Sequence, residues 1–323
     1  MAFDLPTRAR LEEAAAIVHD AMAPTPTHAW PLLAARCGAD VRVKHENHAP
    51  TGAFKVRGGL IHLRALKATN PNARGVVAAT RGNHGQSIAF AARAHGLAAT
   101  IVVPEGNSVE KNAAMYAFGA ELIVHGHDFQ AALEHAQGLA DARGFIMVPS
   151  YAETLVAGVA SYGLELFAAV PDLDTLYVPI GLGSGITACI AAREALGLTT
   201  KIVGVVAEAA PAYALSFAAG EPVSTNSFDT MADSLACRVP VPDAVDLINR
   251  WAGCIVTVSD DAIRAAMRHY FTDTHNVAEG AGAAALAALL QERDAMAGRT
   301  VGVVLSGGNI DRDVYRAILA GDA

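Results

Sequence analysis

Cysteine is scarce in this sequence, and the few cysteines lie far apart. None of the four, Cys37, Cys189, Cys237 and Cys254, belongs to a CxxC pair. This argues against a zinc knuckle and a disulfide framework, and it predicts a reducing compartment, the cytoplasm. The N-terminal segment carries charges throughout and lacks the apolar core of a signal peptide.

Long apolar runs and basic clusters are also missing. The longest run without a charged residue, residues 175–192, has a proline and three glycines between residues 179 and 185. A strand, a turn and a helix start are therefore expected there, and not a membrane span. Lysine and arginine form no cluster and the net charge is −8, which argues against a nucleic-acid partner.

Apolar content and length, in contrast, are ample. The chain has 323 residues, of which 52% are hydrophobic and 17% charged. This composition is typical of a well-buried globular enzyme, and the length allows a large core divided between two lobes.

Short runs rich in β-branched residues alternate with alanine-rich segments that have helical spacing. The runs lie at residues 41–44, 76–79, 100–103, 121–124, 145–148, 176–180, 202–207, 255–258 and 301–305. Strands alternating with helices predict parallel sheets with helices on both faces. Because nine strands are many for one sheet, we predict an α/β fold with two lobes and two sheets.

The spacing of these runs also predicts the domain organisation. Consecutive runs are closest to one another in sequence between residues 76 and 148, and no linker rich in proline, glycine or serine separates two halves of the chain. One lobe is therefore expected to be inserted in the other. We predict a small domain at residues 76–150, inserted in a large domain formed by residues 1–75 and 151–323.

Four glycine-containing turns follow predicted strands: "PTGAFKVRGG", "ATRGNHGQS", "PIGLGSGI" and "LSGGN". In open α/β sheets, ligands bind beyond the carboxyl ends of the strands, where such turns meet. One glycine turn is more often structural than functional. Four of them, each with small polar residues beside the glycines, favour a ligand site.

Two of these turns suit one cofactor. Gly181, Gly183 and Gly185 allow the backbone and the following helix N-terminus to hold a phosphate, although Ile186 breaks the GxGxxG dinucleotide pattern. Lys55 is either a surface lysine or a buried amine for Schiff-base chemistry, with small neighbours making room for a ligand. A reactive lysine with a separate phosphate site is what pyridoxal 5'-phosphate (PLP) requires.

The motifs resemble those of a known family. The order "KHENHAPTGAFKVRGG", "ATRGNHGQSIA", "VPIGLGSGI", "TMADSLA", "EGAGA" and "LSGGN" is similar to that of the fold type II PLP enzymes, whose fold is that of the tryptophan synthase β chain. Within them, the sequence resembles the serine/threonine dehydratase and serine racemase group over roughly residues 15–320. A homodimer is the family expectation.

The resemblance implies a role for each matching residue. Lys55 would form the Schiff base and take the α-proton, Phe54 would pack near the ring, and Asn83 would bind the 3-oxygen. Gly181, Leu182, Gly183, Ser184 and Gly185 would hold the phosphate, Ser306 the pyridine nitrogen, and Glu279 would lie beside the ring. Thr80, Arg81, Gly82, Asn83 and His84 form the turn that would receive the substrate carboxylate.

The resemblance also implies a reaction. A hydroxyl at Ser306 does not force a proton onto the ring nitrogen, so the ring is a weak electron sink and β-elimination is the natural outcome. We therefore expect dehydration and deamination of a β-hydroxy-α-amino acid of the threonine or serine type to a 2-keto acid and ammonia. The alternatives are an amino-acid racemase, a β-replacement synthase, or a protein that only binds PLP or an amino acid.

Three positions depart from the family pattern. Arg81 stands where a small residue, usually serine, acts in racemases, and a permanently charged guanidinium cannot act as that base. It would instead bind a carboxylate, as in 3-hydroxyaspartate, or pair with a protein acid. His48 alters the expected pocket wall, so phenylserine is another candidate substrate. Glu208 matches one acid of the family's metal site, but no acid lies near Ala214, so we expect no metal.

Overall fold

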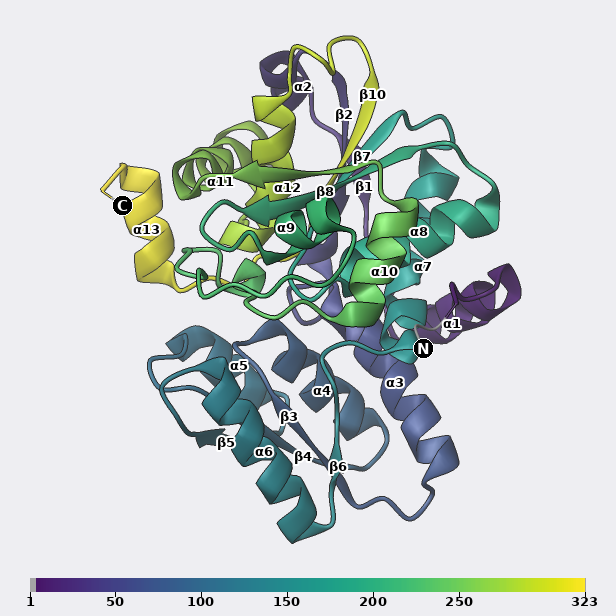
Figure 1. Cartoon of the computed structure of the whole chain (residues 1–323), viewed down its shortest axis with the longest axis vertical. Coiled ribbons are helices and arrows are strands. Elements are labelled where there is room, and N and C mark those ends of the chain that lie inside the picture. Colours follow the sequence, from purple (N-terminus) through teal and green to yellow (C-terminus); the bar gives the residue numbers. More distant parts are fainter. Residues whose placement is uncertain (1–3, 323) are drawn as a thin grey trace.

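Figure 1 shows the two lobes of the chain in a computed structural model that describes residues 4–322. The strands are β1 (Thr27–Ala29), β2 (Asp40–His45), β3 (Gly75–Ala79), β4 (Ala98–Val103), β5 (Glu121–Val124), β6 (Ile146–Met147), β7 (Thr175–Pro179), β8 (Lys201–Ala207), β9 (Cys254–Val258) and β10 (Thr300–Leu305). The helices between them cover both sheets.

The α-helices are α1 (Arg8–Ala21), α2 (Pro31–Cys37), α3 (Lys55–Thr69), α4 (Asn83–Ala94), α5 (Val109–Ala117), α6 (Phe129–Arg143), α7 (Glu153–Ala169), α8 (Ser184–Leu196), α9 (Ala212–Ala219), α10 (Pro242–Trp251), α11 (Asp260–Thr274), α12 (Gly280–Gln291) and α13 (Arg312–Ala320). Two 3-10 helices, η1 (Glu46–His48) and η2 (Asp233–Leu235), follow β2 and precede α10. None of the helices in residues 4–322 has the length and hydrophobicity of a membrane span.

The large sheet has the strand order β1-β2-β10-β7-β8-β9 and the small sheet the order β5-β4-β3-β6. All neighbouring strands are parallel except β1 and β2. The predicted α/β fold with two parallel sheets is thereby confirmed. Because the strands of the small sheet lie between Gly75 and Met147, we propose residues 76–150 as the small domain.

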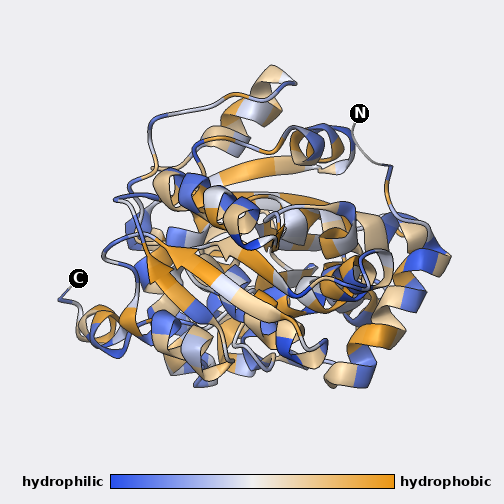
Figure 2. Ribbon diagram, turned by 90° about the horizontal axis from the view of Figure 1, so that it is seen from below, coloured by the Kyte–Doolittle hydropathy of each residue, from blue (hydrophilic) through white to orange (hydrophobic). Residues whose placement is uncertain are grey.

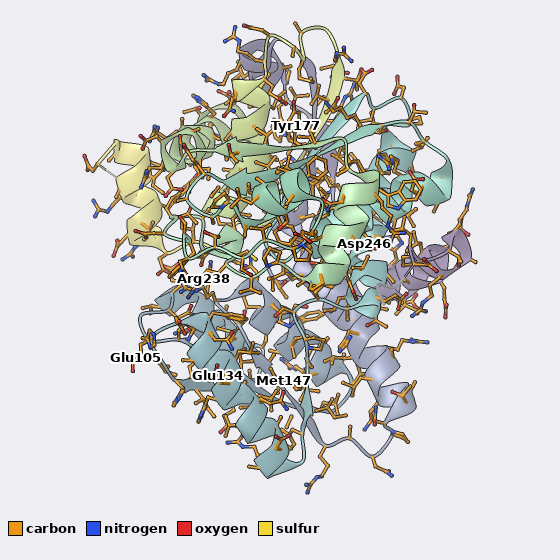
Figure 3. The ribbon with its side chains drawn as sticks, in the orientation of Figure 1. Glu105, Glu134, Met147, Tyr177, Arg238 and Asp246 are labelled. Atoms are coloured by element: carbon orange, nitrogen blue, oxygen red, sulfur yellow. The ribbon has the colours of Figure 1, made fainter. Side chains whose placement is uncertain are left out.

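The apolar helices of the large lobe form its core together with the strands. Every residue of α12 from Gly280 to Leu289 is buried, because this helix packs on β7 to β10 on one side and against α11 on another. Figure 2 shows hydrophobic strands inside a more hydrophilic shell of helices. Tyr177 lies inside this lobe (Figure 3), and its hydroxyl donates to Glu292 at 2.6 Å.

Glycine allows α3 and α7 to lie in close contact where the chain enters and leaves the small lobe. A Cβ atom at Gly158 would lie 2.3 Å from the carbonyl oxygen of Arg57, and one at Gly58 would lie 2.9 Å from that of Leu155. The sequence interpretation that small neighbours of Lys55 make room for a ligand is therefore wrong for Gly58, which makes room for another helix.

A buried ion-pair network joins α3 to the rest of the large lobe. The Arg57 guanidinium, with no exposed surface, donates to Glu46 at 2.7 Å and to Glu165 at 2.6 Å. Lys44 donates to Glu165 at 2.5 Å, and the Thr25 hydroxyl donates to Glu46 at 2.5 Å. Buried charges need such complete pairing, because an unpaired one is costly.

Candidate active site

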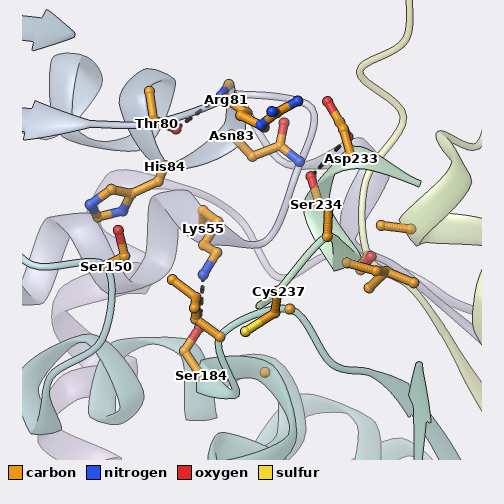
Figure 4. Close-up of a pocket in the computed structure, with 18 of the residues that line it drawn as sticks. Lys55, Thr80, Arg81, Asn83, His84, Ser150, Ser184, Asp233, Ser234 and Cys237 are labelled. Atoms are coloured by element: carbon orange, nitrogen blue, oxygen red, sulfur yellow. Dashed lines mark hydrogen bonds between the residues drawn. The ribbon is translucent and has the colours of Figure 1, made fainter. Parts of the chain in front are cut away.

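A cavity lies between the two lobes at the carboxyl ends of β3, β7 and β10 (Figure 4). It is lined by fourteen of the fifteen predicted site residues: Phe54, Lys55, Thr80, Arg81, Gly82, Asn83, His84, Gly181, Leu182, Gly183, Ser184, Gly185, Glu279 and Ser306. Turns far apart in the sequence therefore meet, as expected for strand ends in parallel sheets.

Lys55 is the first residue of α3 and extends into the middle of this cavity (Figure 4). Its ammonium nitrogen lies 2.9 Å from the hydroxyl of Ser184, and its carbonyl accepts a hydrogen bond from Ser87 at 2.6 Å. Burial lowers the pKa of Lys55 to about 8, because the charged form is poorly solvated there. A substantial fraction of this amine is therefore neutral near physiological pH.

The glycine turn from 181 to 185 leads from β7 into α8. Gly183 has φ +97°, and a Cβ atom there would lie 2.7 Å from that of Ala244. A Cβ at Gly181 would lie 2.3 Å from the carbonyl oxygen of Ser234. The first N–H groups of α8 have no intrahelical acceptor, and Gly183, Ser184 and Gly185 line the cavity, so the turn suits a phosphate.

Asn83 and Glu279 form a fixed pair across the two lobes. The Asn83 amide donates to Glu279 Oε1 at 2.6 Å and accepts from Asn309 at 2.9 Å. The second N–H of that amide is left for a ligand. Burial raises the pKa of Glu279, and the nearby Lys111 ammonium opposes this rise.

The side chain of Thr80 fixes the conformation of the turn from Thr80 to His84. The Thr80 hydroxyl accepts hydrogen bonds from the N–H groups of Gly82 and Gly85 at 2.9 and 3.3 Å. The N–H groups of Asn83 and His84, in the first turn of α4, have no intrahelical acceptor. They are therefore available for a carboxylate.

His84 is a neutral imidazole in this site. Burial lowers its pKa to about 3, with a further contribution from Lys55. Its Nε2 atom is buried and has no hydrogen-bond partner in the described part of the chain. Figure 4 shows the ring beside Ser150, on the opposite side of Lys55 from Asp233.

Arg81 keeps its guanidinium in the cavity. Figure 4 shows the side chain extending across Asn83 toward Asp233. Among residues 4–322, it forms no hydrogen bond or ion pair with another residue within the usual distance limits. A permanently charged group in such a position is suited to an anionic ligand.

The structure does not bring His48 to the cavity, so its predicted place in the substrate pocket wall is wrong. The residue ends η1 on the exposed surface, where its Nε2 lies 2.8 Å from the Asn276 side-chain oxygen and its ring stacks on His45. A short 3-10 turn directs the side chain outward, and the sequence alone does not give that direction.

Several cavity residues were missed: Phe129, Ser150, Asp233, Ser234, Leu235 and Cys237. Ser150 follows the run at 145–148, so the strand-end rule that located the other turns applies to it as well. Asp233 and Ser234 lie within the motif "TMADSLA", for whose residues the family resemblance implied no role. No group of three or more metal-ligating side chains occurs within residues 4–322.

These residues fit PLP. A reactive amine, a glycine turn at a helix N-terminus and a Ser306 hydroxyl at the end of β10 surround one cavity. Residues 18–307 match the family described as pyridoxal-phosphate dependent enzymes. The chain therefore belongs to the PLP-dependent enzymes, and PLP is its cofactor.

Similar proteins narrow the class further. The chain is 32% identical over 289 residues to the L-threonine ammonia-lyase of Thermotoga maritima, covering 89% of this chain and 72% of that protein. The crystal structure of the T.th. threonine deaminase has a TM-score of 0.88 at 31% identity and covers 95% of this chain and 99% of that one. Within the PLP enzymes, the chain is therefore a fold type II lyase of the serine/threonine dehydratase group.

Racemases share the same fold. The structure of maize serine racemase has a TM-score of 0.91 at 26% identity, covering 98% of both chains. The fold is therefore common to lyases and racemases, and similarity of fold alone does not distinguish the two reactions.

Proposed function

We propose that this enzyme is an ammonia-lyase that converts a β-hydroxy-α-amino acid into a 2-keto acid and ammonia. The observation that carries the proposal is the position of Lys55, a partly neutral amine between the glycine turn and the turn at 80–84. The lyase and deaminase relatives described above support the same reaction.

When bound, PLP supplies an aldehyde for the substrate amine and a ring that accepts electron density from Cα. We assign the α-proton to Lys55, because its pKa near 8 permits it to accept and return a proton at neutral pH. The turn at 80–84 binds the substrate carboxylate through its free N–H groups. Lys55 then returns the α-proton to the β-hydroxyl, which leaves as water, and hydrolysis of the released enamine, after it tautomerises to an imine, gives the 2-keto acid and ammonia.

The hydroxyl of Ser306 favours elimination over reactions that need a longer-lived carbanion. A hydroxyl, unlike a carboxylate, would not enforce protonation of a pyridine nitrogen held beside it. Arg81 argues against the racemase alternative, since a guanidinium cannot serve as the second acid or base on the opposite face of the ring. A β-replacement synthase would show little keto acid without a second nucleophile.

Threonine and serine are the default substrates in this proposal, with phenylserine and 3-hydroxyaspartate as candidates. Arg81 favours 3-hydroxyaspartate, because its unpaired guanidinium offers a partner for a second carboxylate. A panel of hydroxy amino acids, with threo and erythro isomers of each, tests the proposal by keto acid formation. Inversion at Cα without any keto acid would establish a racemase instead.

Replacing Arg81 with serine should change substrate preference. We expect kcat/KM for 3-hydroxyaspartate to fall by about 100-fold, the cost of removing one partner of a desolvated charge pair. The value for threonine should stay near that of the parent enzyme. Arg93→Ser, at an exposed position of α4, is the matched control. An equal loss on all substrates would refute a selective role for Arg81.

The depressed pKa of Lys55 predicts how cofactor uptake depends on pH. The protonated amine does not attack an aldehyde, and the neutral amine does. The rate at which the cofactor-free enzyme takes up PLP should therefore rise with pH and level off above about 8. Stopped-flow absorbance measures this rate. A rate that keeps rising beyond about pH 10 would indicate an ordinary lysine.

A further inference from the structure

One buried lysine outside the cavity lining contacts residues of the site from both lobes. Lys111, on α5 of the small lobe, is 5% exposed. Its ammonium nitrogen lies 2.7 Å from Asp233 Oδ2 and 3.3 Å from Glu279 Oε2, and both acids belong to the large lobe. Its aliphatic stem packs on Gly82, where a Cβ atom would lie 2.4 Å from Lys111 Cδ.

The Lys111 side chain therefore contacts three separate parts of the site. Gly82 belongs to the turn that we assign to the substrate carboxylate, Glu279 orients the amide of Asn83, and Asp233 begins η2 on the cavity wall. Gly82 has φ +156° and no room for a side chain, so the stem of Lys111 fixes the position of this turn.

The charges of Lys111, Glu279 and Asp233 depend on one another. Burial alone would lower the pKa of Lys111, but the carboxylates of Glu279 and Asp233 raise it to about 12, so the side chain stays positive. In return, its charge favours the ionised form of Glu279, which can then accept the hydrogen bond from Asn83. Without the lysine, the buried Glu279 carboxylate would lose this charge partner, and its hydrogen bond with the Asn83 amide would be weaker.

The start of α5 is attached to the large lobe at a second point. Asp311 Oδ1 accepts hydrogen bonds from the Ser108 hydroxyl at 2.6 Å and from the Glu110 N–H at 3.2 Å. The Arg312 N–H donates to the Glu110 carboxylate at 2.9 Å. The first turn of α5 therefore already lies against the large lobe, and Lys111 extends from this fixed point toward the cavity.

We propose that Lys111 is a positioning residue for the lyase reaction, which sets the carboxylate-binding turn of the small lobe against Glu279 and Asp233 of the large lobe. The inference rests on the proposed function, since it assigns the turn at 80–84 to the substrate. Lys111 does not contact the substrate. It acts through Gly82 and, by way of Glu279, through Asn83.

The test compares three variants. Lys111→Met keeps the stem that packs on Gly82 and removes the charge, and Lys111→Arg keeps a charge that can still reach the two acids. Lys67→Met is the control, because Lys67 is a partly buried lysine whose ammonium donates to the Ala73 carbonyl, away from the cavity. If Lys111→Met does not fold, Asp233→Asn replaces it and removes the more exposed end of the same ion pair.

Two readouts are needed. Hydrogen exchange of the cofactor-free enzyme should become faster in peptides covering 109–117 and 230–236 in Lys111→Met, and not in the control. In the loaded enzyme, kcat/KM should fall by about 10- to 100-fold, mostly through a higher KM, because a displaced turn binds the carboxylate poorly. Lys111→Arg should recover a large part of both effects.

Unchanged exchange together with unchanged KM in Lys111→Met would overturn the inference. Faster exchange with parent-like kinetics would also overturn it, since Lys111 would then be a purely structural contact. Failure of the proposed function is a separate outcome. In that case the parent enzyme forms no keto acid from any substrate in the panel, while the exchange measurement still reports on the contact between the lobes.

Discussion

Replacing Lys55 with alanine is expected to lower the rate of keto acid formation by about 10⁴-fold or more, because one amine serves as both the covalent anchor and the proton acceptor. The structure offers no substitute, since no other lysine lines the cavity within residues 4–322. The visible absorbance of a lysine-linked cofactor should disappear at the same time. Both are measured on the purified protein after incubation with PLP.

The control for this variant is Lys67→Ala, on the same helix but outside the cavity. It should keep the absorbance and the parent rate. A visible absorbance that persists in Lys55→Ala would show that another amine holds the cofactor, and the site assignment would then be wrong.

Replacing Arg57 with methionine is expected to be the most damaging change to stability. Methionine keeps an unbranched apolar stem, but it leaves the buried carboxylates of Glu46 and Glu165 without their shared partner. Removing one member of a buried ion pair costs about 3–5 kcal/mol in the free energy of unfolding. Urea denaturation followed by circular dichroism measures this loss.

Arg64→Met provides the comparison, since Arg64 is an exposed residue on the same helix. Its change in unfolding free energy should stay within about 0.5 kcal/mol. If Arg57→Met lost no more than this control, the network would contribute little to the stability of the fold.

Much of the fold was predictable from the sequence because its signals are local. Each β-branched run overlaps a strand, and Lys55 begins a helix directly after a turn. β1 was missed, because Thr27–Ala29 contains no apolar run and gains its place by pairing with β2. The run at 145–148 forms only the two-residue strand β6, because its neighbours do not continue the ladder with β3.

The candidate site likewise contains residues that the sequence predicts and residues that it does not. The glycine turns and Lys55 were predictable, because motif order and strand ends identify them. Lys111 was not, because its role depends on contacts with Gly82, Asp233 and Glu279, which are far from it in the sequence. The outward direction of His48 likewise depends on stacking against His45 and bonding to Asn276.

The close contact of α3 and α7 determines where this enzyme can be recombined with a relative. These helices carry the chain into and out of the small lobe, and Gly58 and Gly158 make their surfaces a matched pair. A chimera whose α7 carries a larger residue at the position of Gly158 would place that side chain against the α3 backbone at Arg57. Junctions at residues 70–74 and 148–152 keep this pair from a single parent, and an exchanged small lobe must in addition fit α4 against Gly59 of α3, where a Cβ atom would lie 2.3 Å from the Ser87 hydroxyl oxygen.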